Sequence, residues 1–271
     1  MKSYAIFDEE GNRDTAIGYL FYYEKAEKFI IELCKDIDEW SAPLLFQKAV
    51  RDGIYTIPHS MSKRWVEERI IPSGRQNIGS ILKNHKMQYY NEMTFLKLSN
   101  GRCAQDSCYI EEIPYEDIPS KIRDRSMLNV SECYSTSDGQ LVCLFRDNTA
   151  QKVNLEKIVK KNPDVAYVLQ NRQLLDSVKV GVGGYSVVFN DSIEVEVSDL
   201  REAGRKLPLS AEDFYGFVRK NVVDATQACD MIQCSRQNLS YMVKEGKIDP
   251  ITTGVNTNLY TKGMVEKVMC D

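Results

Sequence analysis

The sequence predicts an α+β protein made of more than one domain. Between residues 16 and 197, runs of aromatic and β-branched residues alternate with Gly, Asn and Asp turns, which is typical of antiparallel strands. Between and after these runs, apolar residues recur at three- and four-residue spacing, which indicates amphipathic helices. The length of 271 residues is enough for two or three domains of ordinary size.

Breaks in composition divide the chain into three predicted domains. An acidic stretch with two prolines, residues 111–120, closes an N-terminal α+β domain at residues 1–125, whose role the sequence does not indicate. A small α+β module with a β-meander follows at residues 126–204. A short connector with a glycine and a proline leads into a C-terminal domain at residues 205–271.

The expected elements follow these patterns. In the N-terminal domain, strands are expected at residues 16–23, 28–33, 53–57 and 93–98, and helices at 41–50, 62–71 and 73–86. In the module, strands are expected at residues 128–134, 141–145, 150–154, 178–180, 185–189 and 193–197, and helices at 155–161 and 163–171. Ser210, with Asp213, is expected to cap a further helix that packs on the C-terminal helices or joins them to the module.

Composition and charge exclude several classes of protein. The formal net charge of −4 gives the chain no general affinity for polyanions. No apolar run approaches the length of a membrane span, and the first residues lack the apolar core of a signal peptide. We therefore expect a cytoplasmic protein that does not contact a membrane.

The eight cysteines are scattered along the chain and are expected to be reduced thiols. Cys103 and Cys108 are the one pair whose spacing invites a zinc interpretation. Structural zinc needs four well-spaced ligands, and both histidines lie far from this pair in the sequence. We expect no metal and no other cofactor.

Residues 224–246 predict two short helices joined by a tight turn. Asp224 and Gln227 have the spacing of a capping box at the start of the first helix. Ser235 offers a cap for the second helix, and Gly246 offers a stop. The apolar face of the first helix consists of Ala225, Ala228, Cys229 and Ile232.

The second helix has two different sides. Leu239, Met242 and Val243 share one side at about 100° per residue. The opposite side is polar and carries no acidic residue; it consists of Arg236, Gln237, Ser240, Tyr241 and Lys244. Arg and Gln side chains can make bidentate contacts with base edges in a major groove. A packed helix followed by a helix with such a side is the arrangement of helix-turn-helix proteins.

Residues 222–269 resemble the winged helix-turn-helix of excisionase and MerR-type proteins. The matching residues are Ala228, Ser235-Arg236-Gln237, Glu245-Gly246-Lys247-Ile248 before a wing, and Leu259-Tyr260 closing it. The resemblance implies binding to double-stranded DNA, with the polar side of the second helix toward the groove. Further contacts are expected from Ser235, Lys247, Asn256 and Asn258.

Two positions depart from that family. Its wing often carries basic residues, where this chain has Asn256 and Asn258, which can bond to phosphate but add no charge. Cys234 stands in the turn, where glycine is usual. The module at residues 126–204 resembles a small bacterial α+β domain of unknown function, and such domains can accompany helix-turn-helix segments.

A second basic region lies in the N-terminal domain. Residues 62–86 contain six Lys and Arg against two Glu. Such a run is commonly a solvated face that balances acidic neighbours. The alternative is a second phosphate-contacting element, with Arg75, Lys83 and Lys86 as the candidates.

The sequence leaves three functional hypotheses. The leading hypothesis is a sequence-specific, DNA-binding transcriptional regulator that could repress its own operon. The alternative is an antitoxin-like or adaptor protein whose N-terminal domain holds a partner protein, with the aromatic run 19–23 and Trp65 either as anchors or as core. An enzyme is disfavoured, because His59 and His85 are the only histidines, neither has a nucleophile at recognisable spacing, and the sequence lacks a phosphate loop.

The charge balance indicates how DNA would be bound. Residues 201–271 hold ten Lys and Arg against nine Asp and Glu, so we expect weak non-specific binding that is sensitive to salt. A single helix-turn-helix contacts few base pairs, which predicts a homo-oligomer. Because the chain has no long C-terminal coiled coil, the dimer interface is expected in the first two domains.

Overall fold

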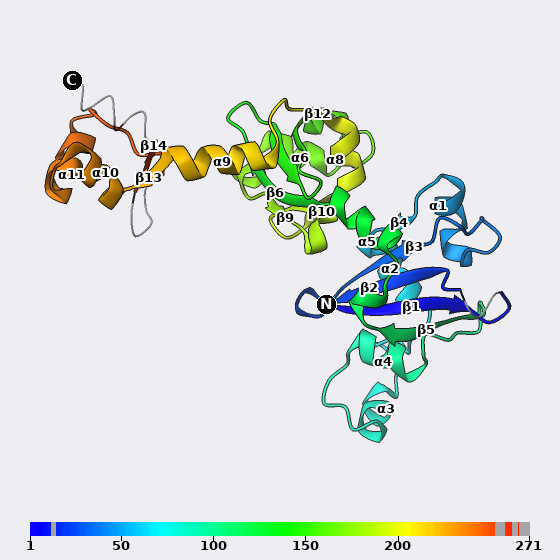
Figure 1. The fold of residues 1–271 in the computed structure, drawn as a ribbon. Coiled ribbons are helices and arrows are strands. Elements are labelled where there is room, and N and C mark those ends of the chain that lie inside the picture. The colour runs from blue at the N-terminus through cyan, green and yellow to red at the C-terminus, as the bar shows by residue number, and fades with distance from the viewer. Residues whose placement is uncertain (12–14, 253–257, 262–264, 266–271) are drawn as a thin grey trace. The chain divides into compact units, whose positions relative to one another are not determined.

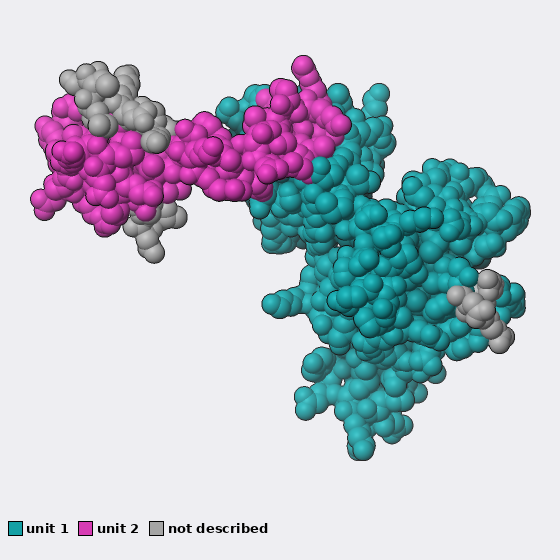
Figure 2. Space-filling model, in the orientation of Figure 1, with its two compact units in different colours: residues 1–147, 153–204 teal, residues 148–152, 205–271 magenta. Residues whose placement is uncertain are grey.

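The computed structural model describes every residue except 12–14, 253–257, 262–264 and 266–271 (Figure 1). The fold is α+β, with helices and antiparallel strand pairs in the same chain. Residues 1–147 and 153–204 form one compact unit, and residues 148–152 and 205–271 form the other (Figure 2). Among the described residues, none of the helices combines the length and apolar character that crossing a membrane requires.

The first unit is built around a five-stranded antiparallel sheet with the order β4-β3-β2-β1-β5. Its strands are β1 (Lys2–Asp8), β2 (Gly18–Tyr23), β3 (Lys28–Leu33), β4 (Thr56–Ile57) and β5 (Cys108–Ile113). The register pairs Tyr4 with Leu20 and Leu20 with Ile31, which aligns three core side chains on one face. Nearly every residue of β2 and β3 is buried, because both faces of the sheet are covered.

Helices cover one face of this sheet. The helical elements between β3 and β5 are η2 (Leu44–Phe46), α1 (Gln47–Arg51), α2 (His59–Glu67), α3 (Ile78–Asn84) and α4 (Glu92–Leu98). All of these except α3 contribute buried side chains to the core on this face. Trp65 of α2 is fully buried here beside Leu20 and Ile31. The aromatic residues 19–22 are buried too, so this run and Trp65 belong to the core instead of forming exposed anchors for a partner.

The opposite face is covered by the segment after β5 and by a loop much later in the sequence. The segment contains η3 (Tyr115–Asp117), α5 (Ser120–Arg123) and η4 (Asp124–Leu128). Ile118 and Ile122 from this segment join Tyr185 over Tyr19 and Phe21 of β2. The N-terminal region and the following region therefore share a hydrophobic cluster.

Glu32 lies on this second face, with 1% of its surface exposed. Its Oε2 accepts hydrogen bonds from Arg125 Nη1 at 2.9 Å and from Thr56 Oγ1 at 2.9 Å. Burial raises the pKa of the Glu32 carboxyl, and the guanidinium of Arg125 acts in the opposite direction. The pair thus compensates a charge that the interior would otherwise disfavour.

The remainder of the first unit has its own core. Its elements are β6 (Val130–Ser135), β7 (Leu141–Phe145), η5 (Leu155–Lys157), α6 (Val165–Gln170), α7 (Arg172–Asp176), β9 (Lys179–Val180), η6 (Val182–Gly184), β10 (Ser186–Phe189), β11 (Ile193–Glu196) and α8 (Val197–Ala203). β6 and β7 form an antiparallel hairpin, and β11, β10 and β9 form a three-stranded sheet in that order. Phe145, Val187 and Leu200 are fully buried in the cluster between them.

The second unit contains most of the C-terminal helices. Its elements are β8 (Ala150–Val153) and β12 (Gly204–Lys206), both at its boundary, then α9 (Ala211–Asn221), β13 (Val222–Asp224), α10 (Ala225–Ile232), α11 (Arg236–Lys244) and β14 (Leu259–Thr261). The short segment 148–152 is tied to the start of this unit, since Leu207 N donates to Ala150 O at 2.9 Å. α9 begins with the predicted capping box of Ser210 and Asp213, which is confirmed.

Several sequence-based predictions in the first unit were wrong. Residues 93–98, expected as a strand, belong to helix α4, because Asn91 caps the first turn by accepting from Thr94 N at 2.9 Å. The expected linker at residues 111–120 begins inside β5, which pairs with the unpredicted strand β1. The helix expected at 41–50 starts later, with Pro43 rather than Ser41 before it.

Removing the Arg125 guanidinium should destabilise the first unit. We expect Arg125→Met to lower its free energy of unfolding by about 3–5 kcal/mol at about pH 7, because Glu32 is left buried without its cation. The pKa of Glu32 in the folded protein is raised, so the carboxyl takes up a proton at low pH and then needs no cation. The loss of stability in Arg125→Met should therefore be smaller at about pH 4 and should grow as the pH rises through the pKa of Glu32. Urea denaturation at both pH values measures the effect.

Arg123→Met is the matched control, because Arg123 lies in the same segment and has no carboxylate within ion-pair distance among the described residues. The double variant Glu32→Gln/Arg125→Met should recover part of the loss. Equal stability of Arg125→Met and the parent protein would contradict the assignment of Arg125 as the compensating charge.

Candidate nucleic-acid interface

Helices α10 and α11 are joined by a short turn and held by the predicted caps. Asp224 accepts from Gln227 N at 2.8 Å, and Gln227 Oε1 accepts from Asp224 N at 3.1 Å, so the capping box is confirmed. Ser235 caps α11 by accepting from Asn238 N at 3.2 Å. Gln233 ends α10 in a left-handed conformation, with φ of 51°, which a non-glycine residue adopts less readily.

The inner side of α11 packs against α10 in a small hydrophobic cluster. Leu239 is 3% exposed and lies with Ala228 and Cys229 in this cluster. Met242 and Val243 pack at its edge, as the helical spacing predicted. Cys234 in the turn also packs against the cluster.

The outer side of α11 is exposed along its whole length. Its exposed residues are Arg236, Gln237, Ser240, Tyr241 and Lys244. Tyr241 is 54% exposed although it is aromatic. Arg236 Nη2 donates to Thr226 Oγ1 of α10 at 2.7 Å, which directs the guanidinium across the first turn of α10. Sequence periodicity had placed these side chains on one side of the helix, and the structure does so.

Positive charge on this surface is not neutralised locally. Arg236, Lys244 and the exposed Lys247 have no carboxylate within 4 Å in the part of the chain that the structure describes. An exposed, uncompensated cation can exchange its hydration for a phosphate oxygen at little cost. The surface therefore carries three such cations beside hydrogen-bonding side chains.

The expected wing is described only in part. β13 pairs antiparallel with β14, with Val223 opposite Tyr260. Asn258 is half-buried, and its Nδ2 donates to Tyr260 Oη at 3.4 Å. This amide is thus engaged with a core tyrosine. Asn256 lies outside the described residues.

The second basic region, residues 62–86, splits into paired and unpaired cations. Lys63 and Arg64 form ion pairs with glutamates, and the buried Arg69 pairs with Asp106. Arg75, Lys83 and Lys86 are exposed and lie on α3 or beside it. None of these three has an ion pair among the described residues. They belong to the first unit, whereas α11 belongs to the second.

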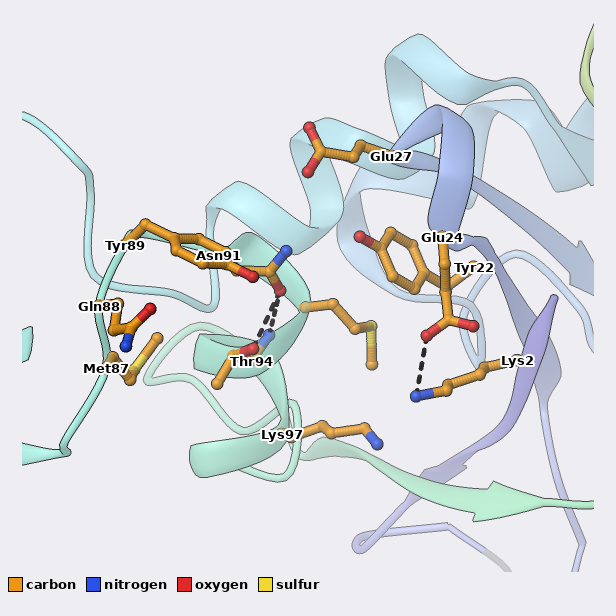
Figure 3. Close-up of a pocket in the computed structure, with 11 residues that line it drawn as sticks. Lys2, Tyr22, Glu24, Glu27, Met87, Gln88, Tyr89, Asn91, Thr94 and Lys97 are labelled. Carbon is orange, nitrogen blue, oxygen red and sulfur yellow. Dashed lines mark hydrogen bonds and ion pairs between the residues drawn. The ribbon is translucent and has the colours of Figure 1, made fainter.

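A pocket in the first unit is lined by charges of both signs (Figure 3). It has a volume of about 580 Å³ and is lined by parts of β1, the turn after β2, and α4. Lys2 pairs with Glu24 at 2.9 Å, and Lys97 pairs with Glu112 at 2.6 Å. Both lysines that line the pocket therefore have carboxylate partners, and neither is an uncompensated cation.

His59 has a structural role. It begins α2 instead of lying in the expected loop, and its Nδ1 accepts from Phe29 N at 3.1 Å. Burial lowers the pKa of the His59 imidazole, which favours the neutral ring. His85 is exposed at the end of α3, as predicted. Among the described residues, no three His, Cys, Asp or Glu side chains gather in an arrangement that could hold a metal ion.

Sequence reasoning missed one pair of cations. Arg123 and Arg146 belong to separate predicted domains, yet the structure places both in one small pocket of the first unit. The two arginines lie in different elements, and no helix or strand spacing relates their positions in the sequence. Only the tertiary fold brings them together.

Comparison with known proteins gave no match: no family model, no curated protein and no solved structure is similar to this chain. The interface must therefore be judged on its own geometry.

Packing of Leu239 should determine whether α11 stays in place. We expect Leu239→Ala to lower the free energy of unfolding of the second unit by about 2–5 kcal/mol, because it removes the central side chain of a small core. The neighbouring exposed residue gives a control, Ser240→Ala, with a change of at most about 0.5 kcal/mol. Chemical denaturation followed by circular dichroism measures both, and similar values for the two variants would contradict this account.

Proposed function

We propose that this protein is a sequence-specific, DNA-binding regulator of transcription with a C-terminal winged helix-turn-helix. The observation that carries the proposal is the two-sided character of α11. Leu239 is buried on one side, and five exposed residues without an acidic group lie on the other. A packed helix with such an outer side can enter a major groove of DNA.

The exposed side chains suit different parts of the duplex. Arg236 and Gln237 lie in the first turn of α11, the end of a recognition helix that reaches base edges. Lys244 and Lys247 lie at the other end, where they can approach phosphates. Arg236 must leave the Thr226 hydroxyl to reach a base, which exchanges one neutral acceptor for another.

The charge of this surface sets the expected salt dependence. Lys244 and Lys247 correspond to about two phosphate contacts per α11 surface, and each contributes roughly −0.9 to the slope of log K against log salt. One copy of the protein should therefore show a slope of about −2, and two copies on a repeated site about twice that. Arg75, Lys83 and Lys86 remain candidates for additional phosphate contacts.

Changing the first turn of α11 should abolish sequence discrimination. We expect Arg236→Ala and Gln237→Ala each to cost about 1–3 kcal/mol on a site selected from random duplexes, because each removes a potential bidentate contact. Affinity for unrelated DNA should change much less. Binding is measured by fluorescence anisotropy at two salt concentrations.

The matched controls are Arg205→Ala and Gln173→Ala, which remove the same exposed side chains elsewhere in the chain. Their affinity for the selected site should equal that of the parent protein. If Arg236→Ala and Gln237→Ala also keep full discrimination while the fold is intact, the assigned reading side of α11 is wrong.

Two copies of the protein would double the number of base pairs that are read, and α9 offers a surface for pairing. Among its residues only Ala211 is buried, whereas Phe214 and Phe217 are 37% and 55% exposed. With Val218 they form one stripe at helical spacing. Asp213 and Lys220 flank the stripe on one side at about 100° per residue, so two antiparallel copies of α9 would bring opposite charges together.

We therefore propose a dimer contact on α9 in the second unit, in place of the first two domains that the sequence had suggested. We expect Phe217→Glu to weaken self-association by tenfold or more, because the pairing surface would have to bury a charge. Gly216→Glu is the matched control, since residue 216 lies on the opposite side of α9 with open space around it. Sedimentation velocity over a concentration series measures both, and a parent protein that stays monomeric rejects the dimer.

A further inference from the structure

A small pocket lies on the second face of the five-stranded sheet, where the N-terminal region meets the region that follows it. Its volume is about 220 Å³. We call it the arginine pocket, and the lining residues that matter here are Tyr23, Tyr115, Arg123, Ser126, Asn129 and Arg146. They come from the end of β2, from η3 to η4, and from the turn after β7. All of them belong to the first unit.

The charge of the arginine pocket is of one sign. Two arginines line it, and its lining contains neither Asp nor Glu. The other four pockets described each combine lysine with a carboxylate. Neither Arg123 nor Arg146 has a carboxylate within ion-pair distance among the described residues. In a chain with a net charge of −4, this is a local concentration of unneutralised positive charge.

Hydrogen bonds fix the backbone that carries both arginines. Ser126 Oγ donates to Arg123 O at 2.6 Å, which closes the turn after α5. Arg146 N donates to Asn129 O at 3.0 Å, and the buried Asn129 donates from Nδ2 to Gly183 O at 3.0 Å. These bonds hold the main chain and leave the guanidinium groups available for a ligand.

Aromatic side chains line part of the pocket. The ring of Tyr115 lies 6.3 Å from the ring of Phe21, measured between centroids. Burial raises the pKa of the Tyr23 hydroxyl to about 12, so this group remains a hydrogen-bond donor at neutral pH. Gly183, with φ of 60°, allows the close approach of its loop to the Tyr23 ring. The pocket thus combines aromatic faces with two cations.

We propose that the arginine pocket binds a small phosphomonoester that carries a planar ring. Two guanidinium groups match the double negative charge of a phosphate monoester and can each donate two parallel hydrogen bonds to its oxygens. A carboxylate would neutralise only one of them. The volume exceeds what a phosphate group alone requires, and the aromatic walls suit stacking or edge contact with a ring. This inference does not depend on DNA binding.

Calorimetric titration of the full-length protein without DNA tests the proposal. The probes are phenyl phosphate, adenosine 5′-monophosphate, inorganic phosphate and benzoate. At least one of the two ring-bearing phosphates should bind with a single site per chain, at least tenfold more tightly than inorganic phosphate or benzoate. Arg123→Gln and Arg146→Gln should each weaken that binding by tenfold or more.

Arg205→Gln removes an exposed arginine outside the pocket, and should leave the affinity unchanged. Arg236→Ala, which alters the proposed DNA surface, should also leave it unchanged, so the two proposals can fail separately. Circular dichroism verifies that each variant is folded. Absence of saturable binding of both ring-bearing phosphates, or equal affinity in the Arg123→Gln, Arg146→Gln and Arg205→Gln variants, would overturn the proposal.

Discussion

Burial of both faces of the five-stranded sheet is the constraint on which the first unit depends. β2 and β3 carry apolar side chains on both sides, so a single layer of helices cannot remove them from water. α2 and α4 cover one face. The other face is completed by α5 and by Tyr185, which is distant in the sequence. Folding of the N-terminal region is therefore linked to folding of the region that follows it.

This linkage also explains the polar groups buried at the same place. Glu32 points to the second face, where water is excluded, and it requires Arg125 from the covering segment. The same covering segment also carries Arg123. Arg123 lines the arginine pocket together with Arg146, which follows β7. Two kinds of charged group therefore lie on this face of the sheet. Glu32 and Arg125 compensate each other, whereas Arg123 and Arg146 have no carboxylate partner among the described residues.

The two candidate binding surfaces both carry unpaired positive charge. Many lysines of the first unit pair with nearby carboxylates, such as Lys28 with Glu194 and Lys97 with Glu112. Exposed pairs of this kind contribute about 0–1 kcal/mol each, so their main effect is to cancel the local field. The outer side of α11 and the arginine pocket lack such cancellation among the described residues. Net charge alone would not reveal either surface.

Short-range patterns were read correctly where the local signal agreed with the packing. Strands β2 and β7, the capping boxes at Ser210 and Asp224, and the two sides of α11 all depend on residues within a few positions of one another. Residues 93–98 were misread because their alternation resembles a strand, whereas Asn91 starts a helix there. β1 and β5 were missed because each is stabilised by pairing with a strand about one hundred residues away.

The sequence by itself determined the α+β class, the caps of the C-terminal helices and which residues of α11 face outward, because turns, caps and helical periodicity are local properties. The tertiary structure decided that the sheet is buried on both faces and that Arg123 meets Arg146. It also decided that Phe214 and Phe217 stay exposed on α9. These outcomes depend on which distant segments exclude water from one another, and no local pattern encodes that.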